Sequence, residues 1–97
     1  MKAFFIANIS EMKNPEKFQE YGQKAGKTLQ PFGGELIIRG KRHAVLTGNS
    51  TSVACGVIGF PSLQKLEAWY ASAEYQAIVP LREEAVTMHI TAYEVPA

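Results

Sequence analysis

A strand that leads directly into a capped helix, between Val57 and Tyr75, constrains the fold of this chain most strongly. The apolar run at 57–60 ends at Pro61, and Ser62 is placed to accept a hydrogen bond from a free N–H in the first turn of a helix. The helix that follows carries its apolar side chains at three- and four-residue steps, namely Leu63, Leu66, Trp69 and Tyr70. The stretch therefore predicts a strand that ends at a proline and a serine-capped helix with an aromatic pair.

A second helix is predicted near the N-terminus. Asn14 and Pro15 form a cap and first-turn pair, and Pro31 with the glycines at 33–34 ends the apolar stripe that follows. Gly22 and Gly26 lower the stability of this helix relative to alanine. Either they permit close packing, or they only add flexibility. That stripe consists of Phe18, Tyr21, Ala25, Leu29 and Phe32.

Ser72 caps a further helix near the C-terminus, and Pro80 falls inside its apolar pattern. Proline removes a backbone donor, so we expect a kink or a restart between residues 77 and 79. Strands are predicted at 2–9, 35–39, 53–60 and 87–95, with a short returning strand at 43–47.

This order of elements is the βαββαβ pattern of a ferredoxin-like α+β fold, in which helices cover one face of an antiparallel sheet. We expect one domain over residues 1–97. The strands are apolar on both faces, which would leave a monomer with a large exposed apolar patch. We therefore expect a homodimer packed through the sheet faces.

Composition excludes several classes of function. The chain has 97 residues, with 10 basic and 9 acidic side chains, so no nucleic-acid partner is expected. The basic group at 39–43 reads as a solvated hairpin tip. The N-terminal apolar run is too short for a signal peptide, and no segment is long enough to cross a membrane, so we expect a cytoplasmic protein.

Several short motifs recur here in the order seen in a known family. They are Asn14-Pro15-Glu16 with Tyr21, Gly33-Gly34, Arg39-Gly40, Phe60-Pro61-Ser62-Leu63, Trp69-Tyr70, Ser72 with Glu74-Tyr75-Gln76, and Leu81-Arg82. In these the chain resembles the domain-of-unknown-function family 1330, of the dimeric α/β barrel superfamily. The resemblance covers nearly the whole chain and implies a ferredoxin-like fold and a dimeric barrel. It brings no defined reaction, although the superfamily includes cofactor-free monooxygenases, muconolactone isomerases and haem-degrading enzymes.

The chain departs from this family pattern at three positions. Thr47, Ala54 and Gly59 stand where relatives tend to carry charged residues. If those charges form one buried network in relatives, we expect all three to be lost together, because a partly paired buried network destabilises a protein more than its complete absence.

Candidate site residues are few. Arg39 either clamps a carboxylate ligand through its planar guanidinium or forms a salt bridge. His89 is either a general base or a hydrogen-bonded sheet histidine, and Asn8 is a polar partner on the sheet. Trp69 and Tyr70 either line a pocket or fill the core.

We expect neither a metal nor a cofactor. The two histidines show no metal-ligand spacing, no glycine-rich phosphate loop is present, and Cys55 reads as a small packed side chain. Arg82 is expected to pair with Glu83, with Glu84 or with a carbonyl.

The sequence is compatible with two functions. The first is a cofactor-free enzyme acting on a small hydrophobic organic molecule above the small residues of strand 53–60. The second is a non-catalytic small-ligand-binding or stress-related dimeric module, which the neutral side chains at 47, 54 and 59 favour.

Overall fold

Strands and helices follow one another in the predicted order in the computed structural model, which describes residues 1–97. The strands are β1 (Ala3–Met12), β2 (Glu35–Lys41), β3 (Ala54–Phe60) and β4 (Val86–Glu94). The helices are α1 (Pro15–Leu29), α2 (Leu63–Ala71), α3 (Ala73–Gln76) and α4 (Val79–Ala85), with a 3₁₀ turn η1 (Gln30–Phe32) after α1. This order confirms the ferredoxin-like α+β prediction.

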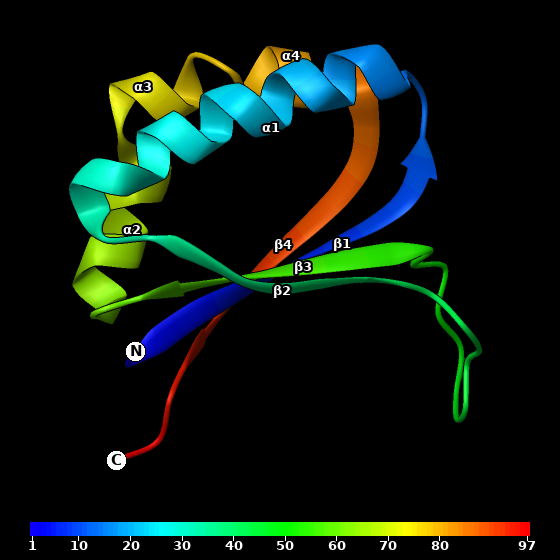
Figure 1. Ribbon diagram of the computed structural model, residues 1–97. Coiled ribbons are helices and arrows are strands. Elements are labelled where there is room, and N and C mark those ends of the chain that lie inside the picture. The colour runs from blue at the N-terminus through cyan, green and yellow to red at the C-terminus, as the bar shows by residue number, and fades with distance from the viewer.

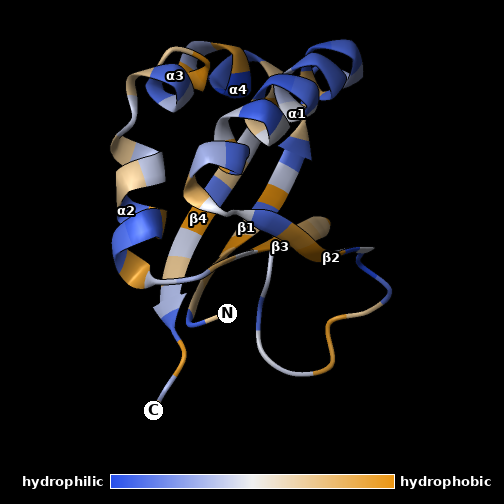
Figure 2. Cartoon of the chain, turned by 60° about the vertical axis from the view of Figure 1, so that its left-hand side comes forward, coloured by the Kyte–Doolittle hydropathy of each residue, from blue (hydrophilic) through white to orange (hydrophobic).

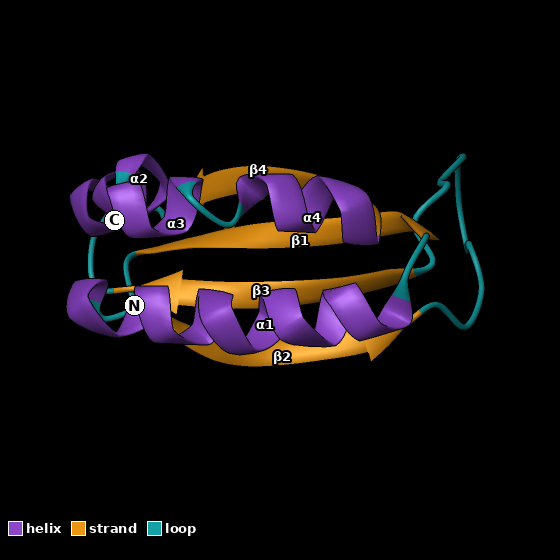
Figure 3. Ribbon diagram, turned by 90° about the horizontal axis from the view of Figure 1, so that it is seen from above, coloured by secondary structure: helices purple, strands orange, loops and turns teal.

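The four strands form one antiparallel sheet in the order β2-β3-β1-β4. All helices lie on one side of it, as Figure 1 shows. In the view from above, α1 runs over β2 and β3, while α2, α3 and α4 run over β1 and β4 (Figure 3). We call the covered side the helix face and the opposite side the free face. None of the helices has the length and apolarity that crossing a membrane requires.

Three helices begin at the caps that the sequence predicts. The side chains of Asn14, Ser62 and Ser72 each accept a hydrogen bond from the backbone N–H three residues on, at 3.0, 3.2 and 3.3 Å. Pro80 lies in the first turn of α4, where its missing N–H breaks no bond, and the helical run restarts there after α3 ends at Gln76. The predicted restart is therefore confirmed.

The predicted short strand at 43–47 is wrong. The ladder between β2 and β3 closes at the pair Lys41 and Ala54, and one further bond joins the Arg42 N–H to the Val53 carbonyl at 2.8 Å. Residues 42–53 extend beyond this closure as an arm without strand pairing, visible in Figure 2. No strand lies beside residues 43–47, so their backbone has no partner for strand hydrogen bonds. The apolar side chain of Leu46 is 92% exposed.

The core lies between the helices and the sheet. Phe5, Phe60 and Trp69 stack at its centre, with ring centroids 5.0–6.1 Å apart. The free face is also apolar and carries no helix: Ile38 is 64% exposed, and the half-buried Phe4 stacks on Tyr93, which is 44% exposed. Both faces are therefore apolar, as the sequence indicates.

Candidate functional site

An apolar cavity lies between α1 and the helix face of the sheet. Its volume is about 260 Å³. Its walls come from β1, β2, β3, β4, α1 and α2, and they consist of Phe5, Ala7, Phe18, Tyr21, Gly22, Ala25, Gly26, Leu29, Leu36, Arg39, Gly56, Ile58, Trp69 and Met88. We call this space the inner cavity.

A second hollow of about 380 Å³ adjoins the inner cavity and reaches the end of β2. The two spaces share six wall residues, namely Ala7, Phe18, Leu36, Arg39, Gly56 and Met88. We call this second space the side cavity. Its further walls include Lys41, Ala54 and Cys55.

Small side chains create the space on both sides of the inner cavity. Ala7 and Gly56 are register partners on the central strands β1 and β3, and both face the helices. Gly22 and Gly26 lie on the facing helix, and a Cβ at either would have no atom within 4 Å. The glycines of α1 therefore border open space. They do not serve close packing, which was one of the two interpretations of the sequence.

Arg39 is the charged side chain of the inner cavity. It lies opposite Gly56 in the register, and its Cβ is 3.9 Å from where a Cβ of Gly56 would stand. The side chain of Arg39 makes no hydrogen bond or ion pair with the protein, and neither cavity is lined by Asp, Glu or His. Its guanidinium donors are therefore free to bind an acceptor on a ligand.

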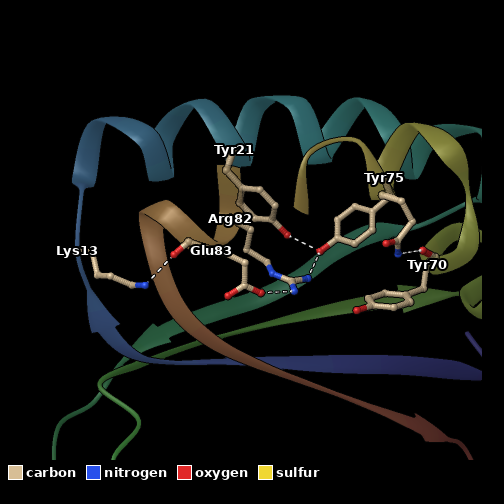
Figure 4. A network of polar contacts seen from close by, with 7 residues as sticks. Lys13, Tyr21, Tyr70, Tyr75, Arg82 and Glu83 are labelled. Atoms are coloured by element: carbon tan, nitrogen blue, oxygen red, sulfur yellow. Dashed lines mark hydrogen bonds and ion pairs between the residues drawn. The ribbon is translucent and has the colours of Figure 1, made fainter. Parts of the chain in front are cut away.

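A buried polar network borders the inner cavity on the side of α3 and α4 (Figure 4). The hydroxyl groups of Tyr21 and Tyr75 are 2.8 Å apart, and Arg82 Nη1 donates to the Tyr75 oxygen at 2.8 Å. Arg82 Nη2 also donates to Glu83 Oε1 at 2.9 Å, which confirms the predicted pairing of these two residues. The network joins α1, α3 and α4 beside the cavity.

Charge in this network is fixed by its surroundings. Burial raises the pKa of the Tyr21 phenol well above its ordinary value, and the neighbouring Tyr75 raises it further, so Tyr21 is neutral. Burial lowers the pKa of Arg82, but hydrogen bonds to Glu83 and Tyr75 outweigh this and raise it overall. Tyr21 therefore offers the cavity wall a neutral phenol rather than a base.

The predicted site residues divide between the two faces of the sheet. Arg39 and Trp69 line the inner cavity, where the indole N–H of Trp69 is engaged by Thr28 Oγ1 at 3.0 Å. Asn8 and His89 are paired in the β1–β4 register on the free face, because side chains alternate along a strand and Ala7 faces the helices. The structure therefore brings Arg39 and Trp69 together and keeps Asn8 and His89 away from the cavity.

Tyr70 takes a third position. It is 40% exposed and lines a separate hollow of about 330 Å³ beside Trp69, between α2 and β4. Its backbone carbonyl accepts a hydrogen bond from the Gln76 side chain at 2.6 Å. Tyr70 thus lies next to the inner cavity without lining it.

The three neutral positions do not form one site within a chain. Ala54 lines the side cavity on the helix face, Thr47 lies in the arm, and Gly59 lies on the free face. A Cβ at Gly59 would meet the side chains of Met1 and, at 3.0 Å, of Ile37, so both side chains would have to shift to admit a larger residue.

Two features of the site were missed at the sequence level. The seven-residue spacing of Tyr75 and Arg82 would place them on one side of a continuous helix, but the chain breaks between α3 and α4, so this spacing gives only a partial signal of their contact. The cavity-lining role of Gly22 and Gly26 has no comparable signal, because glycine spacing alone does not show what a helix faces.

Comparison with known proteins places the chain in a family. Residues 2–95 match the family described as domain of unknown function (DUF1330). The chain is a member of the DUF1330 family. This confirms the resemblance seen in its motifs, and the family description assigns no activity. No curated protein matches the sequence significantly.

Solved structures similar to this DUF1330 chain share its fold at low identity. A protein of unknown function from Rhodopseudomonas palustris is 16% identical, with a TM-score of 0.75 over 99% of this chain and 84% of that one. SnoaB, a cofactor-independent oxygenase from Streptomyces nogalater, is 6% identical, with a TM-score of 0.70 over 99% and 94%. A dimeric ferredoxin-like protein of unknown function from Thermobifida fusca is 12% identical, with a TM-score of 0.64 over 98% and 92%. At these identities the likeness extends to the fold.

Proposed function

We propose that this protein binds a small, largely apolar organic molecule in the inner cavity. The observation that carries the proposal is the cavity itself: about 260 Å³ of apolar space under α1, next to a hollow of about 380 Å³ that shares six of its wall residues. Binding sites for small molecules are typically apolar spaces of this order with a few polar groups, here Arg39 and Lys41.

Filling the cavity tests this proposal. Gly56→Val places a branched side chain into the inner cavity, and its Cβ would lie an ordinary 3.9 Å from Arg39 Cβ. Valine also favours strand structure, so the variant is expected to fold. The matched control is Thr91→Val, a change to the same residue on the free face of the sheet.

The probe is 4-phenyl-1-butanol, a neutral and mostly apolar molecule, with melting temperature and calorimetric titration as readouts. A ligand that binds only the native state stabilises it by about 2.7 kcal/mol at 100 times its Kd. The probe should raise the melting temperature of the wild type and of Thr91→Val, and leave that of Gly56→Val unchanged. Equal binding to all three proteins, or to none, contradicts the proposal.

A second candidate function is cofactor-independent oxygenation of the bound molecule. The fold shared with SnoaB and the apolar character of the cavity favour it. Because Tyr21 is neutral and no Asp, Glu or His lines the cavity, the molecule would have to supply its own ionised group. Oxygen uptake with 1,4-dihydroxynaphthalene, compared between wild type and Gly56→Val, tests it: faster uptake with the wild type supports oxygenation, and equal uptake contradicts it.

The assembly and location belong to the same proposal. A homodimer packed through the free faces would cover Ile38 and Tyr93, which are 64% and 44% exposed, and the fold is shared with a dimeric protein. The proposed unit is one domain over residues 1–97. Its cytoplasmic location stays a prediction from the sequence.

A further inference from the structure

We propose that the ligand is an amphipathic anion, which enters between α1 and the edge strand β2 and whose acidic group is held by Arg39. Its apolar body lies in the inner cavity next to Trp69. This inference rests on the proposed function, because it concerns the ligand of the same cavity. It adds the chemical class of the ligand and the side from which it enters.

The charges of the cavity walls favour an anion. Arg39 and Lys41 are the positively charged residues that line the two adjoining spaces, and no acidic side chain opposes them there. The guanidinium of Arg82, on α4, already donates hydrogen bonds to Tyr75 and Glu83. Arg39 has no such partner, and a guanidinium binds a carboxylate with two parallel hydrogen bonds.

The position of Arg39 sets the orientation of the ligand. Arg39 lines both the inner and the side cavity, so it stands where the two spaces meet. The walls deeper in the inner cavity are apolar and include Ile58 and Trp69. A molecule whose acidic end reaches Arg39 can therefore place its apolar end against these deeper walls.

The glycines of α1 mark the entrance. Gly22 and Gly26 are one helical turn apart, both are exposed, and both line the inner cavity. They flank the apolar stripe of α1 that contains Phe18 and Leu29, on the side away from Tyr21, whose hydroxyl meets α3. The sheet below α1 ends at β2, which is an edge strand. The open border of the cavity therefore runs between the two glycines and β2.

Each glycine weakens α1 relative to alanine, yet neither is packed against another atom. Open space at both positions means that the chain does not use these glycines for close helix contact. Their small size instead leaves a path by which a ligand can enter the cavity.

A matched pair of probes tests the ligand class. The acid is 4-phenylbutanoate, the neutral analogue is 4-phenyl-1-butanol, and both affinities are measured by calorimetric titration. A hydrogen bond to a charged group is stronger than a neutral one, so the wild type should bind the acid about tenfold more tightly. Added salt should weaken binding of the acid and leave that of the alcohol unchanged, because Arg39 is exposed to solvent.

Removing the charge of Arg39 separates this inference from the proposed function. Arg39→Gln should lower the affinity for the acid about tenfold and leave that for the alcohol unchanged. The matched control is Arg42→Gln, which removes a nearby charge that does not line either cavity and should change neither affinity. If wild type binds acid and alcohol equally, or if Arg42→Gln has the effect of Arg39→Gln, the inference is wrong while the proposed function stands. If neither probe binds the wild type, the proposed function fails.

The entrance is tested by filling it. Gly26→Leu should lower the affinity for both probes at least about tenfold without lowering the melting temperature, because leucine favours the helix and its Cβ meets no atom within 4 Å. The smaller Gly26→Ala should show the same direction with a weaker effect. The control is Gln23→Leu, a change on the exposed side of α1 that should leave both affinities unchanged. Unchanged binding in a folded Gly26→Leu protein would contradict an entrance at this border.

Discussion

Replacing Tyr75 by phenylalanine tests how the buried network holds the helices over the cavity. The Tyr75 hydroxyl is 2.8 Å from the hydroxyl of Tyr21 and 2.8 Å from Arg82 Nη1, and Tyr75 is fully buried. Its removal loses one neutral hydrogen bond, worth about 1 kcal/mol, and one to a charged group, worth about 1.5–3 kcal/mol. We therefore expect Tyr75→Phe to lower the free energy of unfolding by about 3 kcal/mol.

The geometry also predicts how a second change will behave. Tyr21→Phe leaves the bond between Arg82 and Tyr75 intact, so it should cost only about 1 kcal/mol. In the double variant the Tyr21–Tyr75 bond is already lost, so the total should stay near the ~3 kcal/mol of Tyr75→Phe alone.

Urea unfolding at one fixed protein concentration measures these values, with the slope m as a check that compactness is unchanged. Costs for Tyr75→Phe and Tyr21→Phe that are equal, or that add fully in the double variant, would refute the picture of Tyr75 as the shared partner.

Three further predictions concern charge, assembly and capping. The hydrogen bond from Arg82 lowers the pKa of Glu83 below its ordinary 4.5, so its stabilising effect is present above pH 4.5 and is lost as the pH falls through the lowered value. The difference in stability between wild type and Glu83→Gln should therefore shrink in acid, as pH-dependent urea unfolding will show. Ile6→Lys on the free face should convert the proposed dimer to a monomer in light scattering, whereas Gln19→Lys on α1 should not; a monomeric wild type would contradict the proposed dimer. Asn14→Ala removes the cap bond to the Lys17 N–H and should cost about 1 kcal/mol in urea unfolding, and an unchanged midpoint would argue against the cap.

Local chemistry made most of the fold predictable. The caps at Asn14, Ser62 and Ser72 and the break before Pro80 are effects of a few adjacent residues, and each is found where the sequence indicates it. The strand predicted at 43–47 failed because pairing depends on a neighbour, and a short apolar pattern does not reveal whether one is present.

The candidate site was predictable only in part. Alternation along β1 and β4 correctly separates Asn8 and His89 from the residues on the other face. Because both faces of the sheet are apolar, the sequence does not reveal which face the helices cover. Arg39 and Trp69 were therefore grouped with Asn8 and His89, although the structure separates the two pairs by the thickness of the sheet.

A crystal structure of the protein with 4-phenylbutanoate tests the central claim most directly. We expect the phenyl ring in the inner cavity beside Trp69 and the carboxylate within hydrogen-bonding distance of the Arg39 guanidinium. An empty inner cavity at saturating concentration, or the molecule bound on the free face beside Asn8 and His89, would contradict it.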